Sequence, residues 1–447
     1  MNKTHFNQEL GHSLRKALSI KTIFLFWGPL AATWLMMSVE GPFLAAIIAR
    51  LQEAKYNLAA YGVAFSFAVL FESPVIMIMS ASTALVKDKD SYLKLKKFTY
   101  ILNAIVTLLL VLFVVPPVFN YIALNIIGLP MEVARLTHYA CFILLPWPAS
   151  IGYRRFYQGL LIRNNLTRRV AYGTGIRLSS MASAALICYL YTTLPGAIVG
   201  AISLSVAVMS EALAVKIMSR KSVAYFLSIE SSKKPMNFVY ITKFYFPLAL
   251  TSILGLAVHP IVTFFLGQSR MAIESLAVLP VVNSLVFIFR SIGLSFQEVA
   301  IALLGEKNEG FKPLRNFCAL LGMAVVSLLF IVTFTPVAFI WFNKISGLSL
   351  ELTKFAIPPS QILTLLPGLT VLISFQRAIL VNNKKTTPIT IATSLEVMVI
   401  FLTLFITIEL LNMVGAVAAA MALIVGRLSA NGYLFWPDTK ILKSKQN

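Results

Sequence analysis

The chain has 447 residues, of which 58% are hydrophobic and only 12% carry a charge, and its mean hydropathy is +0.82. A typical soluble domain has about 25% charged residues, so this composition excludes an ordinary soluble enzyme. The 38 Lys and Arg residues against 17 Asp and Glu residues give a net charge of +21, which in a soluble protein would suggest nucleic acid as a partner. In so apolar a chain the question is instead where the charges lie relative to a membrane.

Twelve apolar runs, separated by polar breaks, follow one another along the chain. Because about 20 apolar residues cross a bilayer as a helix, each run predicts one membrane-spanning helix. In chain order the predicted helices are 23–49, 58–86, 98–124, 135–160, 170–192, 196–218, 239–266, 273–303, 316–342, 352–380, 387–408 and 412–436. The predicted fold class is therefore an all-α integral membrane protein.

Lys and Arg residues concentrate in alternate loops between the predicted helices. With a cytoplasmic N-terminus, 29 of them lie on the cytoplasmic side, six lie on the other side and three lie within spans. The positive-inside rule then predicts that both termini are cytoplasmic, and it accounts for the net charge without nucleic acid. We expect a multi-pass protein of the plasma membrane or of a bacterial inner membrane.

An internal repeat runs through the sequence at an offset of about 219 residues. FWGPLA from Phe26 corresponds to YFPLA from Tyr245, and GAIVGA from Gly196 corresponds to GAVAAA from Gly415. Six predicted helices separate equivalent points, so the repeat predicts two parallel bundles around a central cavity. The predicted parts are a cytoplasmic N-terminal segment (1–22), two six-helix bundles (23–218 and 239–436), a cytoplasmic linker (219–238) and a basic cytoplasmic tail (437–447).

The sequence contains no recognisable enzyme motif. It lacks a phosphate-binding GxxxxGK[ST] loop, and its histidines and cysteines have neither metal-ligand nor disulfide spacing. We therefore expect no enzyme activity and no cofactor, apart from H⁺ or Na⁺ as a coupling ion. The expected partners are a small-molecule substrate and membrane lipids, and the chain is expected to be a monomer.

Three segments of the C-terminal half carry a family resemblance: FYFPLAL from Phe244, HPIVTFFL from His259 and ESLAVLPVV from Glu274. They are similar to the progressive-ankylosis protein family. The proline-broken first and seventh helices resemble the wider superfamily of multidrug and toxic compound extrusion (MATE) and polysaccharide flippase (MOP) transporters. The resemblance implies efflux of small molecules and, for the ankylosis branch, of small anions such as pyrophosphate, citrate or nucleotides.

Acidic residues within the predicted spans are candidates for ion coupling, because a charge inside the bilayer needs a cavity or a partner. Glu40 lies two residues before Pro42, which frees a backbone carbonyl, so Glu40 is a candidate proton or sodium site; the alternatives are an outer-leaflet, water-facing or structural role. The repeat relates Glu72 in the second helix to Arg290 in the eighth. If those helices face each other, the two residues pair and unpair as a gate; the alternatives are a permanent pair or two separately satisfied groups.

Basic residues at the predicted cytoplasmic ends of the fourth and tenth helices are interpreted first as membrane anchors, with an anion funnel as the alternative. They are Arg154, Arg155, Arg163 and Arg377. If the substrate is anionic, we expect Arg290, Arg377 and His259 to bind it or gate its path, because Arg suits planar carboxylate and phosphate groups.

Four prolines fall inside the first and seventh predicted helices: Pro29, Pro42, Pro247 and Pro260. Each is predicted to kink its helix, because proline lacks an N–H and clashes with the carbonyl four residues earlier. A second interpretation makes these kinks hinges for a rocking motion of the two bundles.

Together these features favour a secondary active transporter that exports a small solute, an organic anion or a drug-like molecule, by alternating access. A proton or sodium gradient is the expected driving force. The alternatives are a flippase for a lipid-linked intermediate and a membrane scaffold that transports nothing.

Overall fold

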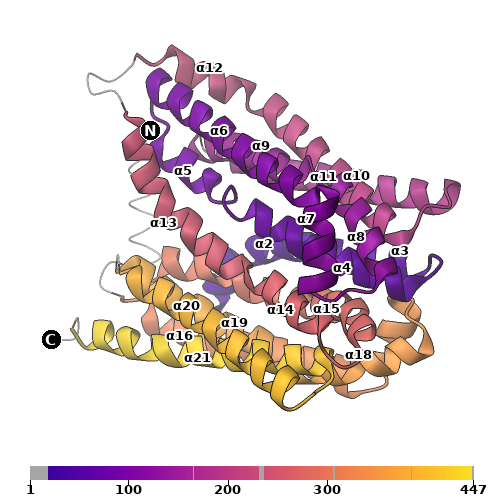
Figure 1. The fold of residues 1–447 in the computed structure, drawn as a ribbon. Coiled ribbons are helices and arrows are strands. Elements are labelled where there is room, and N and C mark those ends of the chain that lie inside the picture. Colours follow the sequence, from indigo (N-terminus) through magenta and orange to yellow (C-terminus); the bar gives the residue numbers. More distant parts are fainter. Residues whose placement is uncertain (1–18, 165, 231–235, 306–307, 384, 445–447) are drawn as a thin grey trace.

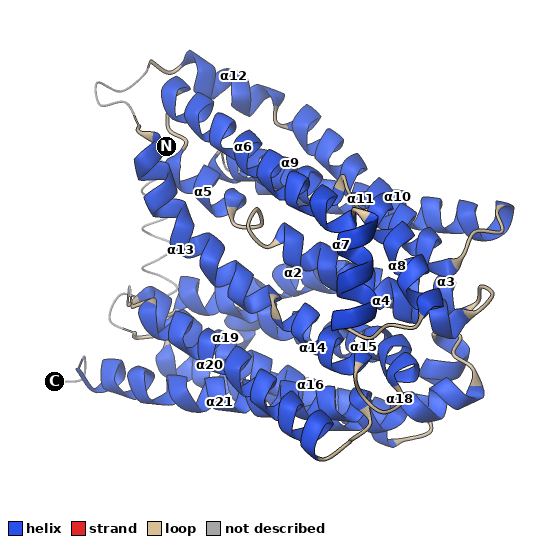
Figure 2. Ribbon diagram, in the orientation of Figure 1, coloured by secondary structure: helices blue, strands red, loops and turns tan. Residues whose placement is uncertain are grey.

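The computed structural model describes residues 19–164, 166–230, 236–305, 308–383 and 385–444. Within these ranges the regular elements are helices, apart from an isolated bridge between Arg270 and Val414 (Figure 2). Most of the predicted N-terminal segment, part of the predicted linker and the last residues of the predicted tail lie outside the described residues.

The N-terminal half is a series of helices joined by short loops. Its helices are α2 (Ile20–Ser38), α3 (Glu40–Ala49), α4 (Ala54–Glu72), α5 (Ile78–Leu85), α6 (Lys89–Val114), α7 (Pro116–Asn120), η1 (Tyr121–Ile126), α8 (Met131–Ile143), α9 (Trp147–Arg163), α10 (Thr167–Tyr191), α11 (Gly196–Met218) and α12 (Arg220–Ser228). All except α12, which falls in the predicted linker, lie within or beside the first six predicted spans.

The C-terminal half repeats this order. Its helices are α13 (Phe238–Leu256), α14 (Val258–Gly267), α15 (Ala272–Leu303), α16 (Phe311–Phe334), α17 (Val337–Phe339), η2 (Ile340–Ile345), α18 (Leu350–Ile362), η3 (Leu363–Leu365), α19 (Leu366–Asn382), α20 (Thr387–Leu404), η4 (Phe405–Leu410) and α21 (Gly415–Ser444). Figure 1 shows the two halves side by side, the first in indigo to magenta and the second from rose through orange to yellow.

Ten of the described helices, some of them formed by two or three consecutive elements, are long and apolar enough to cross a membrane. The two predicted spans outside this set are those at α8–α9 and at α10. A turn separates α8 from α9, which carries Arg154 and Arg155, and Arg177 lies midway along α10. The all-α, multi-pass membrane class is confirmed, whereas the number of twelve spans and the cytoplasmic position of the termini stay predictions.

The internal repeat is visible in details of the backbone. Glu53 and Met271, which precede α4 and α15, both have positive φ, at 51° and 57°. Gly128 and Gly347 have φ of 78° and 76° in the turns that follow η1 and η2. These left-handed positions recur at the predicted offset, so the two halves share local geometry as well as helix order.

The four prolines divide into two pairs with different effects. Pro42 and Pro260 lie in the first turns of α3 and α14, and the carbonyls four residues earlier belong to Ser38 and Leu256, the last residues of α2 and α13. The helix therefore ends where the proline ring would clash with it. Pro29 and Pro247 lie inside α2 and α13, which continue through them.

Each half sends its first helix against the other. Trp27 of α2 donates a hydrogen bond from Nε1 to Ser295 Oγ of α15 at 2.7 Å, and Tyr245 of α13 donates from its hydroxyl to the carbonyl of Pro74 at 2.6 Å. Trp27 and Tyr245 occupy equivalent positions in the repeat. The same hydrogen-bonding role is thus filled twice, once in each direction across the interface.

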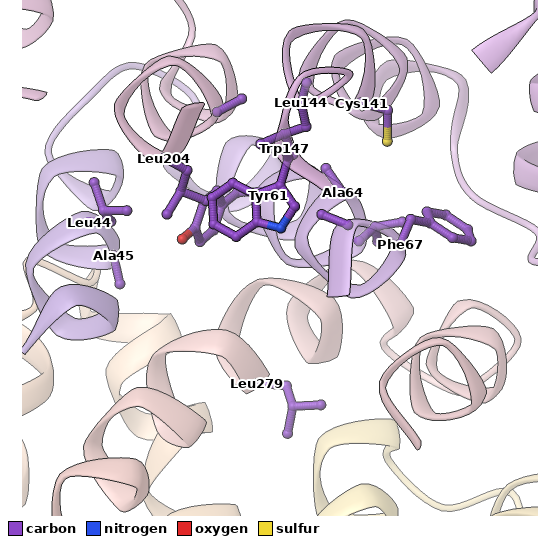
Figure 3. Packing of buried hydrophobic residues seen from close by; sticks show 14 of the residues in the cluster. Leu44, Ala45, Tyr61, Ala64, Phe67, Cys141, Leu144, Trp147, Leu204 and Leu279 are labelled. Carbon is purple, nitrogen blue, oxygen red and sulfur yellow. The ribbon is translucent and has the colours of Figure 1, made fainter. Parts of the chain in front are cut away.

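Close helix packing in the middle of the molecule depends on small residues, as is usual in membranes. A Cβ atom at Gly62 of α4 would lie 2.5 Å from Pro280 Cγ of α15, so only glycine allows this approach between the halves. Within the N-terminal half, the rings of Tyr61 and Trp147 lie in a core with Leu44 and Leu204 (Figure 3). This core holds the charged helices α3, α9, α10 and α11 in place.

Candidate functional site

A cluster of charged and polar side chains lies inside the N-terminal bundle, and we call it the N cluster. It consists of Glu40, Glu72, Arg154, Arg155, Gln158, Arg177 and Glu211, from α3, α4, α9, α10 and α11. Two ion pairs and a tryptophan hold it together. The cluster contains three Arg and three Glu residues, so its formal charge is balanced.

The first ion pair of the N cluster joins Arg177 Nη2 to Glu40 Oε1 at 2.7 Å. The guanidinium of Arg177 also lies over the indole ring of Trp147, 5.9 Å from its centroid. Trp147 in turn donates from Nε1 to Glu72 Oε2 at 2.6 Å. Glu40 and Glu72, the two predicted ion-coupling residues, therefore belong to one connected network.

The second ion pair joins Arg154 of α9 to Glu211 of α11, and both side chains are almost fully buried. Gln158, one turn further along α9, donates to the other carboxylate oxygen of Glu211 at 3.0 Å. The prediction that Arg154 is an interfacial anchor is wrong, because only 4% of this residue is exposed. Burial of an arginine is possible here because Glu211 neutralises it.

Arg155 completes the N cluster without a carboxylate of its own. Its Nη1 lies 3.6 Å from Met79 Sδ, and its Nε is buried without a hydrogen-bond partner. Glu72 and Glu211 lie within electrostatic range, so its charge is compensated at a distance.

A second cluster lies inside the C-terminal bundle, and we call it the C cluster. It consists of Arg290, Arg377, Thr393, Glu396 and Arg427, from α15, α19, α20 and α21. Arg427 donates from Nε to Glu396 Oε1 at 2.8 Å, and Arg377 donates from Nη2 to Thr393 Oγ1 at 3.3 Å. Three Arg against one Glu give this cluster a formal charge of +2.

Arg290 and Arg377 are the unpaired cations of the C cluster. Among the ion pairs between described residues, none includes either of them, and the Nε of each is buried without a hydrogen-bond partner. Both lie within electrostatic range of Arg427 and Glu396. His259 of α14 is exposed and lies within range of Arg290. The three residues predicted for anion binding thus lie in or beside one cluster.

Glu72 and Arg290 do not form an ion pair in this conformation. Glu72 accepts from Trp147 and lies within range of Arg154, Arg155 and Arg177, all of its own bundle. The hypothesis that Glu72 and Arg290 pair as a gate in another conformation stays a prediction. Recovery of transport when both charges are reversed together would support it.

Arg177 and Glu396 show how the repeat has diverged. They occupy equivalent positions in α10 and α20, yet one is a cation and the other an anion. Each is paired with a partner of opposite charge in its own bundle, Glu40 for Arg177 and Arg427 for Glu396. The repeat offset relates the two positions but does not reveal their partners, because Glu40 and Arg427 do not occupy equivalent positions in the repeat.

The two bundles are tied together at the end opposite the basic loops. Arg50, after α3, donates from Nη2 to the carbonyls of Lys344 and Ile345 at 2.8 and 2.9 Å. Gln268, after α14, donates from Nε2 to the carbonyl of Ile126 at 2.8 Å. Arg50 and Gln268 are equivalent in the repeat, and each binds the end of the η helix of the other bundle.

An ion pair between Lys55 of α4 and Glu274 of α15 completes this connection, with Nζ to Oε1 at 2.5 Å. The pair joins the first turns of α4 and α15, two helices that are equivalent in the repeat. We call Arg50, Lys55, Gln268 and Glu274 the latch. Sequence reasoning missed it, because Arg50 and Gln268 donate to backbone carbonyls, which every residue has, and the Lys55–Glu274 pair depends on how α4 and α15 pack.

No protein-family model and no curated protein matches this sequence. Solved structures match its fold. An inward-facing structure of a multidrug resistance MATE family transporter of the MOP superfamily has a TM-score of 0.69 at 17% identity, over 92% of this chain and 96% of its own. The lipid II flippase MurJ, in an inward closed conformation, has a TM-score of 0.69 at 15% identity, over 94% of this chain and 91% of its own.

An outward-facing structure of a multidrug resistance MATE family transporter has a TM-score of 0.59 at 15% identity, over 96% of this chain and 94% of its own. The fold is therefore that of MATE and MurJ transporters, and the predicted resemblance to this superfamily is confirmed at the level of the fold. The narrower resemblance to the progressive-ankylosis family stays a prediction.

Proposed function

We propose that the chain is a secondary active transporter that exports a small anionic solute by alternating access. The observation that carries this proposal is the unbalanced charge of the C cluster, in which Arg290 and Arg377 lack a carboxylate partner. An unneutralised charge at this depth of a membrane is costly. An anion bound to the two guanidinium groups restores neutrality, and its carboxylate or phosphate oxygens match the fork of N–H donors on Arg.

His259 extends the proposed anion site beyond the buried arginines. Its side chain is more exposed than those of Arg290 and Arg377, and it lies within electrostatic range of Arg290. A neutral imidazole offers one N–H donor, and a protonated one offers two donors and a positive charge. We expect His259 to select for anions and the arginines to bind them.

Glu40 is the proposed coupling residue. Its carboxylate is paired with Arg177 at the start of α3, where Pro42 breaks the first span. Binding of H⁺ or Na⁺ to Glu40 weakens that pair and frees Arg177 to move with α10. This links the charge of the N cluster to the position of a helix, which is what coupling to an ion gradient requires.

Two observations favour an inward-facing state of this structure. The latch joins the bundles at the end predicted to be extracellular, and the TM-score to the inward-facing MATE structure, 0.69, exceeds that to the outward-facing one, 0.59. We infer an inward-facing state, with breakage of the latch as a step toward the outward-facing state. The breaks before Pro42 and Pro260 are the proposed hinges, and the continuous helices around Pro29 and Pro247 are expected to bend less.

A flippase for a lipid-linked intermediate is the second candidate. The specific observation in its favour is the match to the lipid II flippase MurJ at the same TM-score, 0.69, as the inward-facing MATE structure. A pyrophosphate headgroup would meet the same two arginines as a small anion. The two functions differ in whether a soluble anion alone is transported.

The test is counterflow in liposomes that contain the purified chain. Citrate, ATP, pyrophosphate and a cationic dye are offered separately, with and without imposed proton and sodium gradients. We expect flux of at least one anion that responds to a gradient and is lost in Arg290→Ala. Arg135→Ala, an exposed arginine of α8, is the matched control and should transport normally.

Other results would redirect the assignment. Flux of the dye alone would contradict an anion site and favour a multidrug exporter. Absence of flux for every soluble solute, together with translocation of a fluorescent lipid pyrophosphate, would favour the flippase. Absence of both would favour the scaffold.

A further inference from the structure

A polar pocket of about 450 Å³ lies at the basic end of the N-terminal bundle, away from both charge clusters. Its lining comes from the end of α5, the loop before α6, the end of α9 and the helix α12. The side chains that matter for its chemistry are Thr83, Lys87, Arg163, Asn164 and Tyr225. Neither the transport proposal nor the fold assigns a role to this pocket.

The pocket exists because α12 folds back over the bundle. Phe226 is 2% exposed and Ser222 is also buried, so one face of this short helix is anchored against α6 and α9. The backbone N–H of Lys89 contacts the carbonyl of Ile229 at 3.4 Å and holds the end of α12 near the start of α6. Tyr225, next to Phe226, is 55% exposed and lies on the part of α12 that does not pack against the bundle.

The two cations of the pocket are available to a ligand. Arg163 uses Nη1 to donate to the carbonyl of Thr83 at 2.7 Å, which fixes the guanidinium while leaving most of its five donors free. Lys87 is exposed, and among the described residues neither cation forms an ion pair. The neighbouring carboxylate of Asp88 is turned to the backbone N–H of Ser91, which it caps at 2.9 Å.

We propose that this pocket binds the phosphate group of a phosphate ester, held by Arg163 and Lys87 with Asn164 and Tyr225 as further donors. A fixed guanidinium matches two phosphate oxygens, and a flexible ammonium completes the neutralisation of charge. The volume exceeds that of a bare phosphate and leaves room for the group esterified to it.

The phosphate ester can be the headgroup of an anionic lipid or a soluble molecule. The pocket lies at the predicted cytoplasmic surface, where basic pockets between membrane helices meet lipid headgroups. Tyr225, which lines the pocket, is 55% exposed, so its ring offers apolar surface to a lipid beside the polar donors. These features favour the lipid, and the experiment separates the two sources.

The full chain, purified in detergent, is titrated with phosphatidylglycerol, with phosphatidylcholine and with glycerol 3-phosphate, and bound ligand is counted by native mass spectrometry. We expect one saturable adduct of phosphatidylglycerol. In Lys87→Gln/Arg163→Gln its affinity should fall about tenfold, the effect of losing two charge-assisted contacts. Lys89→Gln/Lys221→Gln, which removes two exposed cations of the same end outside the pocket, is the matched control and should bind as before.

Lys87→Gln alone keeps the test valid if the double variant does not fold, because the Lys87 side chain makes none of the intramolecular contacts described above. Saturable binding of glycerol 3-phosphate with the same dependence on Lys87 and Arg163 would support the site and assign it to a soluble ester. Equal loss in the control pair would show nonspecific attraction to a basic surface and overturn the proposal. Unchanged binding in Lys87→Gln and in the double variant would overturn it as well.

Discussion

The two bundles bury charge in corresponding places but balance it differently. The N cluster has three Arg and three Glu residues, joined by two ion pairs and by Trp147. The C cluster has three Arg residues, one Glu residue and one ion pair. The two halves of a duplicated fold can therefore keep the same helix order while the side chains inside them diverge in charge. A balanced cluster suits structure and ion coupling, whereas an unbalanced one suits binding of an anion.

The largest expected effect comes from unbalancing the N cluster at its most buried pair. Glu211→Ala leaves Arg154 buried without a counter-charge and should destabilise the fold by about 3–5 kcal/mol. Thermal unfolding of the purified protein in detergent measures it, with Glu132→Ala, exposed on α8, as the control. Equal unfolding temperatures for the two variants would show that the pair does not support the fold.

The next effect comes from making the C cluster resemble the N cluster. Arg290→Glu leaves two Arg and two Glu residues, so the cluster becomes neutral. Anion counterflow should fall about 100-fold, which corresponds to about 2.8 kcal/mol. Lys354→Glu, an exposed lysine of α18, removes the same charge elsewhere and should leave counterflow intact. Retention of anion flux in Arg290→Glu would separate transport from the charge of the C cluster.

The proposed division of tasks is tested further by removing one negative charge from the N cluster while the C cluster stays unchanged. Glu40→Gln keeps the size of the side chain but removes the carboxylate proposed to take up the coupling ion. Accumulation driven by a proton or sodium gradient should fall about tenfold, while counterflow without a gradient continues, because the anion site is intact. Loss of both activities would instead assign Glu40 to the structure of the transport path.

The smallest expected effect concerns the latch, to which both bundles contribute side chains. A partly exposed pair such as Lys55 and Glu274 contributes about 0–1 kcal/mol, so Lys55→Ala should shift the populations of the two states up to about fivefold. Spin labels at Gln52→Cys and Arg270→Cys report the separation of the bundles. More of the separated state is expected in Lys55→Ala than in Lys354→Ala. An equal distribution in both variants would remove Lys55 from the latch.

Much of the fold could be predicted from the sequence, because length, apolar composition and the repeat are properties of single segments. The breaks before Pro42 and Pro260 agree with the chemistry of proline, but α2 and α13 continue through Pro29 and Pro247, so proline alone does not determine where a helix breaks. The repeat placed Glu72 and Arg290 at corresponding positions, but equivalence does not determine which way a side chain faces. Each successive residue of a helix is rotated by about 100°, so partners depend on packing that the sequence does not display.

Only part of the candidate site could be predicted, because the sequence shows which residues are ionisable but not which side chains face each other. Arg290, Arg377 and His259 were found because ionisable residues stand out in apolar spans. Arg154 was misread as an anchor, although its spacing of four from Gln158 places both on one face of α9, and both contact Glu211. That spacing was the available signal.

The central claim is that anions bind to the C cluster and not to the N cluster, and direct binding tests it best. Radiolabelled citrate and pyrophosphate are bound to the purified chain, to Arg290→Ala and to Arg155→Ala, which removes the unpaired arginine of the balanced cluster. We expect affinity for at least one anion to fall tenfold or more in Arg290→Ala, about 1.4 kcal/mol, and to change less than about twofold in Arg155→Ala. Equal losses in the two variants, or full binding by Arg290→Ala, would contradict it.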